Sequence, residues 1–181
     1  MVQQKTLLRS GCVLLALLGS VVSQAAAQNA AGQPVVKIAV FDFELQDSSP
    51  GGGIIAQDAH DTRYLAEATE MAERLLVESG RYSLVETEDA GIQGEAPRGI
   101  RNCDGCEAPA AQKLGAEQAM IGVVNRISRA EYTLAIRVSD AETGQVLSND
   151  FTNLRMGSND SWPRAVRSLM RQRMLANPAA N

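Results

Sequence analysis

Cys103 and Cys106 are the residues whose type and spacing most directly suggest chemistry in this chain of 181 residues. A Cys-Asp-Gly-Cys segment can be a disulfide, a reactive thiol pair or part of a metal site. We expect a disulfide that staples a loop, because thiols this close are stable as a bridge in an oxidising compartment. The alternative is a thiol-disulfide redox protein, in which a helix beginning near Pro109 would favour a reactive thiolate.

A second candidate site contains Asp58, His60 and Asp61, because clustered His and Asp side chains can bind a metal or move protons. We interpret these residues instead as helix-capping and solvated groups. A structural zinc site normally needs four protein ligands, and residues 28–181 contain two cysteines and one histidine. No serine lies in a nucleophile-elbow pattern, and the glycine run at 51–53 lacks the lysine of a phosphate loop. The sequence therefore predicts no catalytic residue, no metal and no cofactor.

The first 27 residues are typical of a secretory signal peptide. Lys5 and Arg9 are their only charges, an apolar run over residues 13–22 follows, and small residues lead to Ala27. The apolar run is too short to span a bilayer, which takes about 20 residues. We expect cleavage after Ala27 and export to the periplasm, with Cys12 discarded in the signal.

The mature chain has the length of one domain of ordinary size. Loss of Lys5 and Arg9 changes its formal net charge from −4 to −6. An acidic chain argues against a nucleic-acid binder, which needs a basic face to neutralise phosphates. We expect a flexible leader at 28–34, a single domain at 35–176 and a disordered tail at 177–181, with no transmembrane segment after the signal.

The apolar pattern predicts an α/β (α+β) domain with a mixed parallel and antiparallel sheet of about five strands. A nearly continuous apolar run at 35–43 predicts a central strand, and an amphipathic helix at 62–79, capped by Asp61 or Thr62, leads to a strand at 81–86. That order indicates a parallel crossover. The remaining expected elements are a short helix at 108–114, strands at 118–127, 131–140 and 145–154, and a helix that Ser161 caps and that buries Trp162, Val166, Leu169 and Met170.

Two surfaces are candidates for contact with a partner. One is a glycine-containing loop expected over residues 44–61, of which 46–61 would form the contact. The other is the last helix, which carries Arg164, Arg167 and Arg171 on its polar face. These arginines either form a solvated face that complements the helix dipole or recognise an anionic partner surface.

Four segments together resemble an uncharacterised family of small exported bacterial proteins, the domain of unknown function 2380. They are residues 36–45, the cysteine pair with residues 113–116, the strand end at 140–144, and the Asn-Asp-Ser-Trp segment within 157–162. More loosely, the order of elements is similar to the amino-terminal domain of the Tol system's β-propeller protein and to modules of outer-membrane assembly lipoproteins. The resemblance implies a non-catalytic domain used for protein contacts in the periplasm.

We therefore predict an exported accessory protein that binds another envelope protein or a small ligand and is not an enzyme. No lipid anchor and no attached propeller are expected, so the Tol role itself is not implied. The alternative remains a periplasmic redox protein that uses Cys103 and Cys106. The oligomeric state is left open by the residues.

Overall fold

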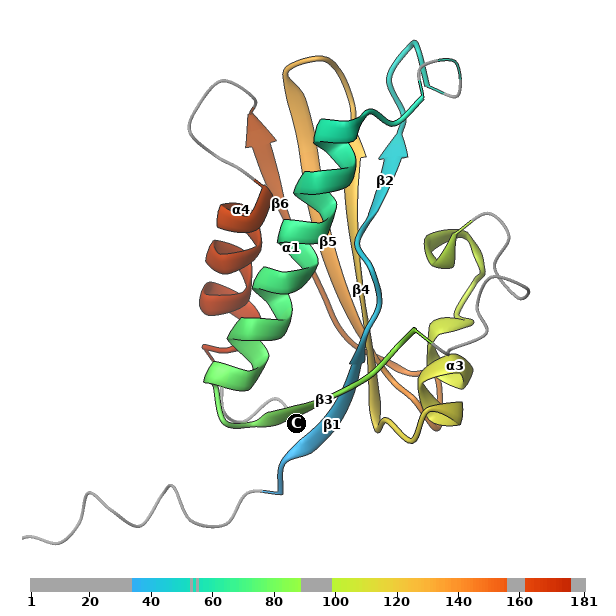
Figure 1. Ribbon diagram of the computed structural model, residues 1–181, viewed down its shortest axis with the longest axis vertical. Coiled ribbons are helices and arrows are strands. Elements are labelled where there is room, and N and C mark those ends of the chain that lie inside the picture. The colour runs from blue at the N-terminus through green and yellow to red at the C-terminus, as the bar shows by residue number, and fades with distance from the viewer. Residues whose placement is uncertain (1–33, 53, 55, 89–98, 156–161, 177–181) are drawn as a thin grey trace, which may run out of the picture. The chain divides into compact units, whose positions relative to one another are not determined.

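The computed structural model describes residues 34–52, 54, 56–88, 99–155 and 162–176 (Figure 1). The predicted signal peptide, residues 28–33 of the leader, the tail and Ser161 lie outside the described residues. Among the helices of the described residues, none has the length and apolar character needed to span a bilayer.

A six-stranded sheet forms the centre of the domain (Figure 1). Its strand order is β3-β1-β4-β5-β6, and β2 also pairs with β4. The pairs that involve β1 or β2 are parallel, and the β4-β5 and β5-β6 pairs are antiparallel, which confirms the predicted mixed sheet and parallel crossover. The strands are β1 (Val36–Val40), β2 (Glu44–Asp47), β3 (Tyr82–Val85), β4 (Gln118–Arg126), β5 (Glu131–Asp140) and β6 (Val146–Arg155).

The strand β2 corrects the prediction of a continuous loop over residues 44–61. The expected first strand ends at Val40, and the chain pairs with β4 again at Glu44, opposite Val123. Between the two strands, the buried Phe43 donates its backbone N–H to Thr69 Oγ1 over 3.0 Å. The ring of Phe43 occupies the space where a Cβ atom of residue 122 would lie. Glycine at 122 therefore lets the chain cross from β1 to β2 with an aromatic side chain pressed onto β4.

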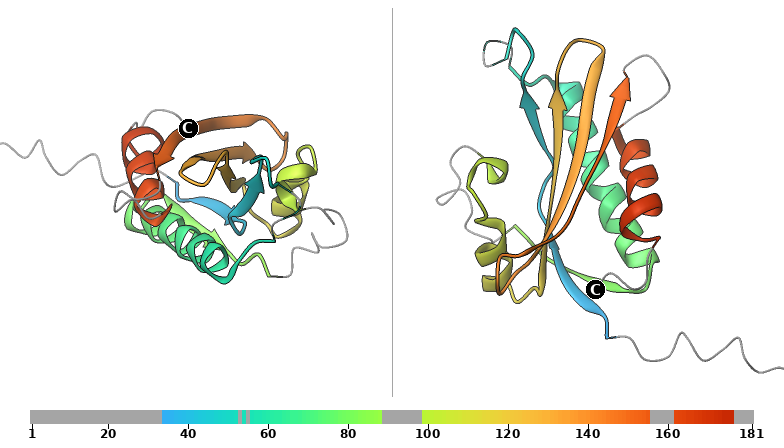
Figure 2. Two further views of the ribbon diagram at one scale, coloured as in Figure 1. Left: turned by 90° about the horizontal axis from the view of Figure 1, so that it is seen from above. Right: turned by 180° about the vertical axis from the view of Figure 1, so that it is seen from behind.

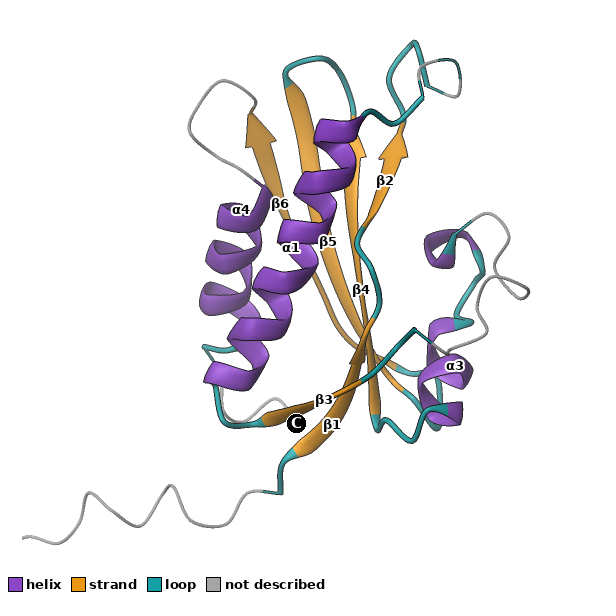
Figure 3. Ribbon diagram, viewed as in Figure 1, coloured by secondary structure: helices purple, strands orange, loops and turns teal. Residues whose placement is uncertain are grey.

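Helices cover both faces of the sheet (Figures 2 and 3). The helices α1 (Ala59–Glu78) and α4 (Trp162–Leu169) lie on one face, which we call the inner face, and the π-helical turn η2 (Met170–Met174) continues α4. The short helix α3 (Glu107–Lys113) and the 3₁₀ turn η1 (Ile100–Asn102) lie on the opposite, outer face. The sheet is thus a layer between a large helical layer and a small one.

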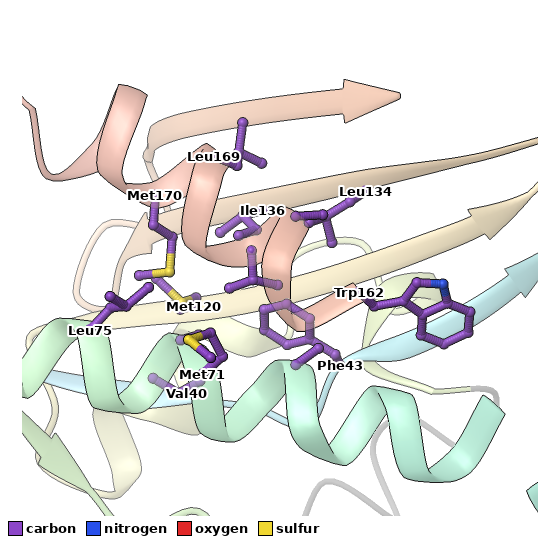
Figure 4. Close-up of a cluster of buried hydrophobic side chains, with 14 of the residues drawn as sticks. Val40, Phe43, Met71, Leu75, Met120, Leu134, Ile136, Trp162, Leu169 and Met170 are labelled. Atoms are coloured by element: carbon purple, nitrogen blue, oxygen red, sulfur yellow. The ribbon is translucent and has the colours of Figure 1, made fainter. Parts of the chain in front are cut away.

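The hydrophobic core has two parts. The larger lies between the inner face of the sheet, α1 and α4, and Figure 4 shows Met71 and Leu75 from α1 facing strand residues such as Met120. A smaller, alanine-rich cluster lies beneath α3. The predicted inward positions are buried as expected, namely Tyr132, Leu134, Ile136 and Val138 on β5 and Trp162, Val166, Leu169 and Met170 at the end of the chain.

The start of α1 differs from the expected one by three residues. Asp58, rather than Asp61 or Thr62, is the N-cap, and its Oδ1 accepts the backbone N–H of Asp61 over 2.8 Å. The Asp61 carboxylate accepts the backbone N–H of Asp58 over 3.4 Å, which completes a capping box. Two acidic residues three apart satisfy this motif together, so the helix begins before the apolar periodicity does.

Candidate interaction surfaces

Arg126, the last residue of β4, binds two carboxylates from two other elements. Its Nη1 donates to Asp47 Oδ2 over 3.1 Å, and its Nη2 donates to Asp61 Oδ2. Its Nε donates to the Tyr132 hydroxyl over 3.3 Å. The bond with Asp61, followed by those with Tyr132 and Asp47, raises the pKa of the Arg126 guanidinium above its ordinary value. This ionic cluster fixes both ends of the connection between β2 and α1.

A polar groove of about 330 Å³ lies beside that cluster. Residues from β2, the connection to α1, η1 and the end of β4 line it, including Gln57, Arg101 and Arg126. Both arginines are already paired, because Arg101 Nη1 donates to Glu44 Oε2 over 2.8 Å. The segment at 46–61, predicted as a contact surface, thus borders a groove whose cations are neutralised within the domain.

Glu44 holds η1 on the outer face of the sheet. Its Oε1 accepts the backbone N–H of Ile100 over 2.7 Å, and its Oε2 accepts that of Arg101 over 3.1 Å. Gly99 precedes this turn with φ of +89°, and a Cβ atom there would lie 2.6 Å from the Glu44 carboxylate. The positive φ angle therefore favours glycine at 99, and a side chain there would also displace the Glu44 carboxylate.

Cys103 and Cys106 are joined by a disulfide between η1 and α3, and their Cα atoms are 5.4 Å apart. Both are half-buried and pack against the cluster beneath α3. The two residues between them, Asp104 and Gly105, have positive φ angles of 53° and 96°. The bridge thus lies across a tight turn at the edge of the smaller core.

Glu107 connects that region to the sheet. It is buried, and its Oε1 accepts from Arg137 Nη2 over 2.7 Å and from the Ser139 hydroxyl over 3.3 Å. Sequence reasoning missed this ion pair and the Arg126 cluster, because their partners come together only when the strands pair.

The helix α4, which is continued by η2, lies on the opposite face of the sheet from α3 (Figures 1 and 2). Arg164, Arg167 and Arg171 are all exposed, and we call these three residues the arginine surface. Neither Arg167 nor Arg171 forms an ion pair with a carboxylate of the described residues. The prediction that these residues face outward agrees with their exposure, and their role as a partner surface stays a prediction.

A second groove, of about 430 Å³, lies between the end of α1 and η2. Leu75 and Leu175 give it an apolar lining, and Glu78, Arg81 and Arg171 give it polar lining residues. Arg81 Nη2 donates to the carbonyl of Met174 over 3.2 Å, which fixes η2 against the start of β3. The groove therefore extends the arginine surface toward α1.

His60 and its neighbours form no assembled site. His60 is exposed in the first turn of α1, with its ring centroid 6.4 Å from that of Tyr64, while Asp58 and Asp61 are used in the capping box. Within the described ranges, no group of three or more His, Cys, Asp or Glu side chains is arranged to hold a metal ion.

Together, the fold and these surfaces define a small α+β domain in which the polar clusters described above hold elements together. The family of proteins of unknown function DUF2380 matches residues 36–174, and the chain belongs to that family. This confirms the resemblance found in the sequence. No curated protein sequence matches the chain.

Solved structures with a similar fold include the C-terminal domain of LpoB from Salmonella enterica, with a TM-score of 0.50 and 15% identity over 70% of this chain and 87% of that one. Lipoprotein GNA1162 from Neisseria meningitidis gives a TM-score of 0.46 and 18% identity, covering 80% and 99%. TolB from Acinetobacter baumannii gives 0.45 and 16%, covering 75% of this chain and 26% of that one. At these identities, the likeness to the LpoB domain is one of fold.

Proposed function

We propose that the protein is an exported, non-catalytic accessory protein of the cell envelope, and that its arginine surface binds an acidic segment of another envelope protein. Export is supported by the signal-like order of residues 1–27. The fold that the domain shares with the C-terminal domain of LpoB is consistent with this proposal.

The observation that carries the proposal is that Arg167 and Arg171, which form no ion pair with a carboxylate of the described residues, lie at or near a groove with an apolar lining. Arg171 lies at the groove that contains Leu75 and Leu175, and Arg167 is exposed one turn earlier in the helix. Protein interfaces are enriched in arginine around an apolar centre, because the guanidinium forms directional bonds and stacks on apolar groups.

Because the chain as a whole is acidic, the arginine surface would favour an acidic partner over other proteins. The mature chain has a formal net charge of −6, so a cationic surface is a local exception that orients an acidic partner. Glu78 on the α1 side of the groove is paired with no described cation and would repel a carboxylate placed there. The acidic residues of the partner would therefore lie toward α4 and its apolar residues toward Leu75.

Crosslinking and pull-down of the mature protein from envelope extract test the proposal, followed by binding assays with the purified partner. We expect the double variant Arg167→Glu/Arg171→Glu to lose affinity about tenfold or more. Arg129→Glu is the control, since Arg129 is exposed in the turn between β4 and β5. A partner that binds both variants as well as the native protein would contradict the arginine surface as the binding site.

A further inference from the structure

The strand β6 is an edge strand with an unusual exposed face. It lies at one end of the strand order and spans ten residues. Edge strands are commonly protected from pairing by lysine, proline or short length, and β6 has none of these. Phe151, near its middle, is 73% exposed, and its outer-face neighbours Asn149 and Asn153 are exposed too.

A β-bulge limits the part of β6 that can pair regularly. Ser139 is opposite Val146 and Val138 is opposite Ser148, so Leu147 is the extra residue. From Ser148 onward the register with β5 is regular. The stretch at 148–154 therefore keeps a regular strand pairing that another strand could continue, and Phe151 is its central residue.

We infer that a second copy of this chain pairs its β6 antiparallel to this one, with a two-fold axis at Phe151, so that two sheets join into one. Three apolar residues form a row across the outer face and end at the proposed axis. They are Val123 on β4, Ala135 on β5 and Phe151 on β6, each opposite the next. Pairing would bring the two Phe151 rings together and remove both from water.

The sequence of β6 is self-complementary in this register. On the outer face, Asn149 lies opposite Asn153 of the second copy, so that paired amides flank the aromatic pair on both sides. On the inner face, Asp150 lies opposite Thr152, whose hydroxyl can donate to the carboxylate. Each of these pairs occurs twice because of the two-fold axis.

Neighbouring registers that keep side chains on the correct face are less favourable. A shift of the axis to residue 150 places the two Asp150 carboxylates opposite each other, where like charges repel. A shift to residue 152 places Asp150 opposite Leu154, which is buried in the inner core. The axis at Phe151 is therefore selected by charge and by burial.

Sedimentation velocity of the mature protein over a range of concentrations tests this arrangement. We expect a reversible dimer, and Phe151→Lys should raise its dissociation constant about tenfold or more. Leu84→Lys is the matched control, because Leu84 is 38% exposed on β3, the strand at the other edge. Circular dichroism of both variants shows whether the fold is retained.

The register is tested by cysteine crosslinking. A mixture of Asn149→Cys and Asn153→Cys chains should form an intermolecular disulfide, whereas each variant alone should not, because identical residues would be four positions out of register. A protein that stays monomeric at the highest concentration overturns the inference. So does crosslinking by either variant alone, or a dimer that Leu84→Lys disrupts and Phe151→Lys does not.

Dimerisation through β6 does not depend on the proposed envelope partner. Arg167→Glu/Arg171→Glu should dimerise normally, since the proposed pairing is formed by the backbone and side chains of β6. The native protein could instead be monomeric and bind an extended peptide. If Phe151→Lys abolishes that binding, the β6 edge pairs with a peptide and the proposed dimer is wrong.

Discussion

Arg126 and Asp61 are bonded across 65 positions of sequence, and each has a second role at its own element. Arg126 ends β4 and also binds Asp47, while Asp61 closes the capping box of α1. The side chains of Arg126 and Asp61 are 14% and 10% exposed. One guanidinium therefore connects the end of the sheet to the start of the main helix.

Replacing Arg126 with methionine should reduce the free energy of unfolding by about 2 kcal/mol, because the buried Asp61 carboxylate loses its charged hydrogen-bond donor. Chemical denaturation of the mature protein measures the change. Arg63→Met is the control, since the pair of Arg63 with Glu67 is exposed and should contribute less than about 0.5 kcal/mol. Equal destabilisation by the two substitutions would show that the cluster does not hold the fold.

The contribution of the Asp47 carboxylate to the stability of the fold should decrease in acid. Hydrogen bonds from Ser49 and then from Arg126 hold the pKa of Asp47 below its ordinary value of 3.8. A carboxylate with a lowered folded pKa stabilises the protein above its ordinary pKa, and this stabilisation is lost as the pH falls through the folded pKa. Unfolding measured between pH 6 and pH 2.5 should therefore show a smaller acid loss for Asp47→Asn than for the native protein. An identical pH dependence would contradict this account.

Glu73 should have the opposite effect on the pH dependence of stability, because its ionised form destabilises the fold. Burial, followed by the charges of Asp42, Glu86 and Glu70, raises the pKa of Glu73 above its ordinary value of 4.5. Its ionised form is disfavoured in the folded state, so the penalty is present above the folded pKa and disappears as the pH falls below the ordinary value.

Glu73→Gln should consequently stabilise the protein at pH 7 by a few tenths of a kcal/mol, and the gain should vanish near pH 4. Paired thermal melts at the two pH values measure it. Glu131→Gln, at an exposed position, serves as the charge-matched control. A gain of the same size at both pH values would rule out an electrostatic origin.

The disulfide should stabilise the domain modestly. In the loop-entropy model, closing a loop of four residues is worth about 2 kcal/mol. Cys103→Ser/Cys106→Ser should lower the free energy of unfolding by that amount and accelerate amide exchange in η1 and α3, while exchange in α1 should change little. A reduction potential well below that of glutathione would agree with a staple, whereas turnover of disulfide substrates would support the redox alternative.

The regular elements were predictable because their signals are local. The alternation of β5 and the amphipathic spacing of α1 follow from side chains close in sequence, so β5 forms over the expected residues and α1 begins only three residues early. The strand β2 has four residues and half-exposed side chains, so no local pattern distinguishes it from a loop. It forms because β4 offers an open edge beyond the point where β1 ends.

The ionic clusters were not predictable for a related reason. Asp47 and Arg126 are separated by 79 positions, and neither residue type is unusual at the end of a strand. The capping box, in contrast, had a local signal, since Asp58 and Asp61 have the required spacing.

The contact of Phe43 with Gly122 has a consequence for how this chain can vary. A methyl group at 122 would collide with the aromatic ring, and a smaller residue at 43 would leave a cavity over β4. Gly122→Ala or Phe43→Leu alone should therefore destabilise the domain. The double change Phe43→Leu/Gly122→Ala restores much of the lost volume. The two positions are thus coupled, so the effect of the double change on the free energy of unfolding should be smaller than the sum of the two single effects.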